Sequence, residues 1–128
     1  MDKYKFVEFK STGSRFNLVI TLGKAERFYL GSSFCTKYDI FSMVGVKLFY
    51  DKTNNAVGFR FVKEAEEGMV GIKSLDDKSA YINAKAFLGI NDIDPQKYIG
   101  RYHPVEVTDD GGRKVFVVEL KEADKKTV

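Results

Sequence analysis

The sequence is poor in the residues from which cross-links, metal sites and catalytic centres are commonly built. Its 128 residues include one cysteine, one histidine and no tryptophan. A single cysteine, Cys35, excludes an intrachain disulfide. Because His103 is the only histidine, a zinc site with the usual nitrogen and sulfur ligands is not available either. We therefore expect no metal, and we interpret Cys35 as a buried structural thiol rather than a nucleophile.

Long apolar runs and nucleotide-binding loops are also missing. No segment approaches 18 consecutive apolar residues, so no membrane span is predicted. The opening MDKYKFVEFK lacks the continuous apolar run of a signal peptide. No glycine loop of the kind that cradles phosphates occurs. We expect a cytoplasmic protein that makes no membrane contact, uses no cofactor and is not an enzyme.

Three acidic clusters have the residue types that bind Mg²⁺ or act in acid–base catalysis. They lie at residues 76–77, 92–94 and 109–110. Each stands in a turn or at the start of a short helix, where aspartate is used for hydrogen bonds to nearby backbone N–H groups. We interpret them as turn and cap residues.

Aromatic rings are abundant, with eleven phenylalanines and seven tyrosines, and 44% of the residues are hydrophobic. Phenylalanine and tyrosine favour strands. The length predicts a single compact domain over residues 1–128. The net charge of +3 is mildly basic, and on its own it does not indicate a nucleic-acid partner.

Residues 44–62 carry the clearest strand pattern in the chain. Apolar residues recur at every second position on both sides of the segment DKTNN, whose aspartate and asparagines suit a tight turn. The pattern predicts a β-hairpin. Its alternation also predicts that Phe59 and Phe61 face the core while basic neighbours such as Arg60 face water.

The hairpin recurs further along the chain. A shift of 59 residues without a gap places Val46 on Val105, and it keeps all five core positions of the hairpin apolar. A shift of 52 residues matches the preceding strands, and it places Tyr29 on Tyr81. We interpret residues 16–62 and 70–121 as an internal repeat, although hairpins also recur by chance in chains rich in strands.

Each repeat also contains a short helix. Helices are predicted at residues 32–38 and 84–88, the second with Asn83 as its N-cap and Gly89 just beyond its end. One further helical turn is predicted where Asp94 precedes Pro95. The expected fold is mainly β with short helices (α+β). In it, two β-β-α-β-β units in tandem form an intertwined, pseudo-twofold β-barrel.

Residues 115–118, with the sequence VFVV, are apolar at four consecutive positions. A strand that is apolar on both faces is usually central and covered on both sides. The cover can come from the first repeat or from a second subunit. The pattern therefore favours a homodimer without requiring one.

The order of elements resembles the swapped-hairpin fold of the AbrB/SpoVT/MazE family of bacterial DNA-binding and antitoxin domains, in a tandem form. The family signature is a turn with Gly-Arg, a short apolar strand, proline, a short helix and an apolar hairpin. The first repeat offers Gly23, Arg27 and the strand Phe28-Tyr29-Leu30. The second offers Lys78 and residues 80–82. Neither repeat has the proline, and the second lacks the arginine.

The resemblance implies a transcriptional regulator that binds DNA through basic residues on the turns before the helices. Carried over residue by residue, it points to Lys24, Arg27 and Lys78. Further candidate nucleic-acid contacts are Arg15, Lys73 and Arg101. Two alternatives remain open at this stage. One is a single-stranded nucleic-acid binder that uses a sheet with exposed aromatic rings, and the other is a domain that binds another protein.

Overall fold

A computed structural model describes residues 18–122. Within that range the chain is mainly β with short helices, as predicted. The strands are β1 (Ile20–Leu22), β2 (Arg27–Leu30), β3 (Gly45–Asp51), β4 (Ala56–Val62), β5 (Val70–Ser74), β6 (Ala80–Asn83), β7 (Gly100–Tyr102), β8 (Val105–Thr108) and β9 (Lys114–Glu119). The helices are α2 (Ser32–Lys37), the 3₁₀ turn η1 (Ile40–Ser42), α3 (Lys85–Ile90) and α4 (Pro95–Tyr98).

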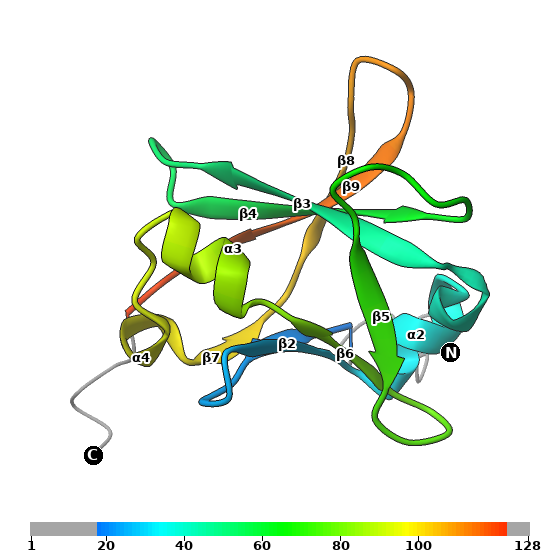
Figure 1. The fold of residues 1–128 in the computed structure, drawn as a ribbon, viewed down its shortest axis with the longest axis horizontal. Coiled ribbons are helices and arrows are strands. Elements are labelled where there is room, and N and C mark those ends of the chain that lie inside the picture. The colour runs from blue at the N-terminus through cyan, green and yellow to red at the C-terminus, as the bar shows by residue number, and fades with distance from the viewer. Residues whose placement is uncertain (1–17, 123–128) are drawn as a thin grey trace, which may run out of the picture.

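The strands form one curled antiparallel sheet, a half-barrel, in the order β7-β1-β2-β6-β5-β3-β4-β9-β8. Figure 1 shows β3, β4, β8 and β9 in an upper layer and β2, β6 and β7 in a lower layer, with β5 running between them. The two outermost strands of this order, β7 and β8, are consecutive in the chain and are separated only by His103 and Pro104. One bent segment thus joins the two ends of the curled sheet.

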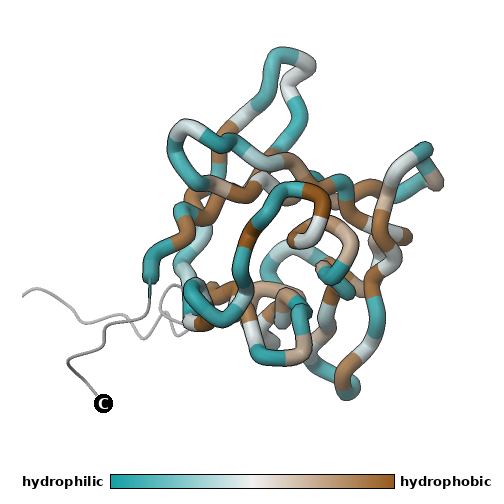
Figure 2. Tube along the Cα trace, turned by 60° about the vertical axis from the view of Figure 1, so that its left-hand side comes forward, coloured by the Kyte–Doolittle hydropathy of each residue, from teal (hydrophilic) through white to brown (hydrophobic). Residues whose placement is uncertain are grey.

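The core lies between the two layers because alternate residues of each strand point inward. Phe28 of β2 and Phe59 of β4 are fully buried, and their ring centroids are 4.9 Å apart in an edge-to-face arrangement. This contact links the lower layer to the upper one. Apolar and polar positions alternate along the strands in Figure 2, and the connecting turns are mostly hydrophilic.

The short helices cover opposite ends of the half-barrel, with α2 at one end and α3 at the other in Figure 1. The ends predicted for α3 are each displaced. The N-cap position is Ala84, although the Asn83 side chain accepts a hydrogen bond from the Lys85 N–H at 3.1 Å, and the helix continues through Gly89 to Ile90. The backbone turns left-handed only at Asp92, with φ of 55°, a conformation that aspartate tolerates. The predicted turn at α4 is confirmed, because the Asp94 side chain accepts a hydrogen bond from the Gln96 N–H.

The first hairpin is confirmed as β3 and β4, but the gapless match of the second hairpin is wrong. Val46 lies opposite Phe61 in the first hairpin, so the shift of 59 would place Val105 opposite Leu120. Val105 lies opposite Val117 instead. The second loop (109–113) is longer than the first (52–55), and Pro104 interrupts the strand before it. Val117, the partner of Val105, faces outward, so Val105 also lies on the outer face, where at 62% it is among the most exposed apolar residues rather than a core residue.

Two predictions about the upper layer also need correction. Phe59 faces the core as predicted, but Arg60 is only 7% exposed because its guanidinium pairs with the Glu66 carboxylate. In β9, Phe116 is buried, whereas Val117 on the opposite face is half-exposed. Val115 and Val117 are only partly buried on that outer face, next to Phe49 and Gly58 of the first repeat. Cover by a second subunit stays a prediction.

Candidate nucleic-acid interface

The outer face of the lower layer carries one row of side chains across five strands. Strand pairing places Arg101 of β7 opposite Thr21 of β1, and Thr21 opposite Tyr29 of β2. It also places Tyr29 opposite Tyr81 of β6, and Tyr81 opposite Lys73 of β5. Because their neighbours along β1, β2 and β6 are buried, these side chains point away from the core.

Arg27 lies beside the centre of this row. Its guanidinium carbon is 4.4 Å from the centroid of the Tyr81 ring, within the range of a cation–π contact. The Tyr29 and Tyr81 rings are 6.1 Å apart and tilted by 44°. A Cβ atom at Gly23 would lie 2.7 Å from the Tyr29 ring, so that ring packs closely over the turn between β1 and β2. The tyrosines are therefore held in place rather than free.

We call the residues of the row, together with Arg27, the cationic face. Its members are Thr21, Arg27, Tyr29, Lys73, Tyr81 and Arg101. Three of the six are cations, and the outward positions of these five strands include no carboxylate. Acidic side chains near the face (Glu26, Asp76 and Asp77) are confined to the two turns at its margin. The strands themselves thus present only positive charge, and the carboxylates lie in the turns at the margin.

The two turns at the margin add Lys24, between β1 and β2, and Lys78, between β5 and β6. In the second turn the Asp76 carboxylate accepts hydrogen bonds from the N–H groups of Lys78 and Ser79, at 2.8 and 2.7 Å. These bonds lower the pKa of Asp76, which confirms its predicted structural role. A hollow of about 390 Å³ beside this turn is bordered by Lys78 and Arg101 as well as by Asp76, which connects the turn to the row.

The structure brings together five of the six basic residues predicted from the sequence. Arg27, Lys73 and Arg101 lie on the cationic face, and Lys24 and Lys78 lie in the turns at its margin. Arg15 lies outside the described residues. The residues that sequence reasoning missed are Thr21, Tyr29 and Tyr81. The available signal was the shift of 52 residues, which superposes the two tyrosines but does not say that they are neighbours.

Another hollow, of about 780 Å³, lies where β7 and β8 meet and includes His103. Its border mixes Arg101 and Lys121 with Glu119 and Glu122. It therefore does not select for an anionic partner as the cationic face does.

Cys35 is a buried structural thiol, as predicted. It is 1% exposed, and its Sγ–H donates to the Leu30 carbonyl at 3.6 Å. Burial raises the pKa of the thiol to about 11. A thiol of this kind is almost wholly protonated at neutral pH and is a poor nucleophile.

Residues 18–122 contain no group of three or more His, Cys, Asp or Glu side chains arranged to hold a metal ion. In the same range no helix has both the length and the apolar character needed to cross a membrane. Comparisons with models of protein families, with curated proteins and with solved structures give no match to the chain.

Proposed function

We propose that this protein binds double-stranded DNA with its cationic face, as a small regulator similar to the swapped-hairpin domains. The observation that carries the proposal is the row Arg101–Thr21–Tyr29–Tyr81–Lys73, which bears cations at both ends and no carboxylate. Nucleic-acid affinity comes largely from neutralising phosphates with lysine and arginine. A face with this charge pattern suits that task.

The dimensions of the face favour a duplex. Neighbouring strands are about 4.8 Å apart, so four strand spacings separate Arg101 from Lys73 by roughly 19 Å along the sheet. This exceeds the width of the major groove, about 12 Å. The outer face of a curled sheet is convex. Its centre can therefore enter a groove while Arg101 and Lys73 reach phosphates on the two sides.

The arrangement of the tyrosines argues against single-strand binding as the main activity. Base stacking needs an open ring face. The guanidinium of Arg27 already lies over the Tyr81 ring, and Tyr29 packs over the turn at Gly23. Both tyrosines are half-buried. We assign them to positioning the cations rather than to stacking on bases.

We also infer that the chain is a tandem of two β-β-α-β-β units related by a local twofold axis. Under the shift of 52, the pair Phe28–Ile82 of β2 and β6 maps onto the pair Leu30–Ala80 of the same two strands. The pairing of β4 with β9 behaves in the same way under the shift of 59. Val57 corresponds to Phe116 and Val118 corresponds to Phe59, so the pair Val57–Val118 corresponds to the observed pair Phe59–Phe116. These registers support the inference, whereas the register of β8 departs from it.

Fluorescence anisotropy with a labelled mixed-sequence duplex tests DNA binding. If five cations (Lys24, Arg27, Lys73, Lys78 and Arg101) each neutralise one phosphate, the slope of log K against log[salt] is about −4.5. Replacing Lys73 or Arg101 by glutamine should reduce that slope by about 1. Both side chains are exposed, so the fold should be unaffected, which circular dichroism can verify.

Matched controls are K52Q and K63Q, two exposed lysines that lie in the upper layer and its connector. They should leave the slope unchanged. Absence of binding at about 50 mM salt, or equal losses in the control variants, would contradict the proposal. Competition with a single strand of the same sequence separates the alternatives. A single strand that displaces the duplex at much lower concentration would favour the single-strand reading instead.

A further inference from the structure

A second hollow of interest lies on the other half of the molecule, on the outer face of the upper layer. Strand pairing places Phe49 of β3 opposite Gly58 of β4, Gly58 opposite Val117 of β9, and Val117 opposite Val105 of β8. Because Gly58 has no side chain, the row is interrupted by a depression. A Cβ atom there would lie 3.3 Å from Val115 Cγ1, so even a methyl group would begin to fill the floor.

The depression is part of a groove of about 470 Å³, a size within the range of small-molecule sites, about 300–1,000 Å³. We call it the apolar groove. Its walls are apolar side chains of three strands, β3, β8 and β9, and polar groups stand at its two ends. The apolar walls are formed by Phe49, Val107, Val115 and Val117.

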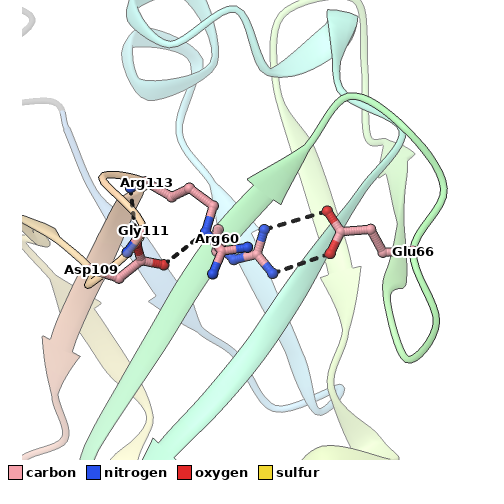
Figure 3. A network of polar contacts seen from close by, with 5 residues as sticks. All are labelled: Arg60, Glu66, Asp109, Gly111 and Arg113. Carbon is pink, nitrogen blue, oxygen red and sulfur yellow. Dashed lines mark hydrogen bonds and ion pairs between the residues drawn. The ribbon is translucent and has the colours of Figure 1, made fainter.

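One end of the apolar groove is cationic. Lys47 lies opposite Arg60 in the pairing of β3 with β4, and both residues line the groove together with Arg113. Figure 3 shows Arg60 between the Asp109–Arg113 pair and Glu66. The charges of Arg60, Lys47 and Arg113 all contribute to lowering the pKa of Glu66. Three cations (Lys47, Arg60 and Arg113) and two carboxylates (Glu66 and Asp109) thus lie at this end of the groove.

Arg60 carries an unused hydrogen-bond donor. Its two terminal nitrogens donate to the Glu66 carboxylate at 3.1 and 3.4 Å. Its Nε atom is buried and has no hydrogen-bond partner among the described residues. Buried donors in folded proteins nearly always have a partner. Lys47 makes no ion pair with any described residue either.

The other end of the groove repels anions. Asp51 lines it, and hydrogen bonds from the Asn54 side chain and backbone lower the pKa of Asp51, so the carboxylate is charged at neutral pH. A ligand with a negative charge at each end would place one of these charges beside the Asp51 carboxylate and would be repelled by it. A ligand with one negative charge and an apolar body fits the charges of both ends.

We propose that the apolar groove binds a small amphipathic monocarboxylate. Its carboxylate accepts hydrogen bonds from Arg60 Nε and from Lys47, and its apolar body lies over Gly58 between Phe49 and Val117. The ionic head gives orientation, and burial of the apolar body supplies most of the affinity. This site is separate from the cationic face and does not depend on DNA binding.

NMR titration of ¹⁵N-labelled full-length protein tests the proposal, with 3-phenylpropionate as the probe. The neutral 3-phenylpropanol, which has nearly the same shape, is the matched ligand. We expect amide shifts centred on Gly58 and Val117, and a dissociation constant at least about tenfold lower for the acid than for the alcohol. K47M should remove most of that difference, whereas K63M, on the exposed connector, should leave it unchanged.

G58V keeps the charges but fills the floor, and it should weaken both ligands. Lys47 is partly exposed, and methionine keeps an unbranched side chain of similar length. K47M therefore removes the charge with little change in packing, and it keeps the test valid even if G58V unfolds. Three results would overturn the proposal. They are shifts centred elsewhere, equal affinity for acid and alcohol, and a dimer in sedimentation that V107K dissociates. The last result would mean that a second copy covers the groove.

Discussion

The contact between Phe28 and Phe59 gives the sharpest test of how the sheet curls. Phe28 lies on β2 in the lower layer and Phe59 lies on β4 in the upper layer, and both are fully buried. Strands β2 and β4 are not neighbours in the sheet. The rings can therefore meet only if the sheet folds back on itself.

We expect F28A to lower the free energy of unfolding by about 3–5 kcal/mol, which is typical when a buried phenylalanine is truncated. That is a large share of the roughly 5–15 kcal/mol available to a domain. With a urea m value of about 2 kcal/mol/M, the unfolding midpoint should fall by about 1.5–2.5 M. The exposed ring of Phe41, at 49%, is the control, and F41A should cost less than about 1 kcal/mol.

The edge-to-face geometry adds a second, more specific expectation. Such ring pairs are worth about 0.5–1.5 kcal/mol beyond area burial. A cycle of F28L, F59L and the double variant should show coupling of that size, since leucine keeps the core filled. Because the chain has no tryptophan, circular dichroism and tyrosine fluorescence are the probes. Additive effects, or an F28A cost below about 1 kcal/mol, would refute the packing of the two layers described above.

Two further predictions concern titratable groups. Burial raises the pKa of Cys35 from 9.0 to about 11. The folded chain therefore keeps this proton where the unfolded chain loses it, so stability is full below about pH 9 and falls as the pH rises to about 11. At pH 8 the folded thiol should react with a disulfide reagent more than about a hundredfold slower than in urea, and equal rates would contradict its burial. For Glu66, the bond from Arg60 lowers the pKa of the carboxyl. The stability that it contributes is full above the usual glutamate pKa and is lost as the pH falls through the lowered value. E66Q should remove this part of the acid dependence of the urea midpoint, and an unchanged dependence would show that the ion pair does not contribute.

The sequence by itself determined the local structure, because strands, turns and caps depend on residues close together in the chain. Alternating apolar residues predicted β3 and β4, and the Asp-Pro pair predicted the start of α4. The same reasoning failed where a distant contact decided the outcome. Arg60 occupies an outward position, as alternation requires, but Glu66 from the next connector covers it. Val105 has the pattern of a core residue, but its pairing with Val117 of β9 places it on the outer face of the sheet.

The candidate site shows the same division between local and distant information. The resemblance to the swapped-hairpin family pointed to Lys24, Arg27 and Lys78, and Lys73 and Arg101 were further basic candidates in the sequence. Only the strand order brought them to one face, because β7 pairs with β1 and β2 pairs with β6 across long stretches of chain. Side-chain periodicity fixes which face of a strand is buried but says nothing about which strand lies beside it. That lateral order is set by how the two layers pack around their shared core, and it exists only in the folded chain.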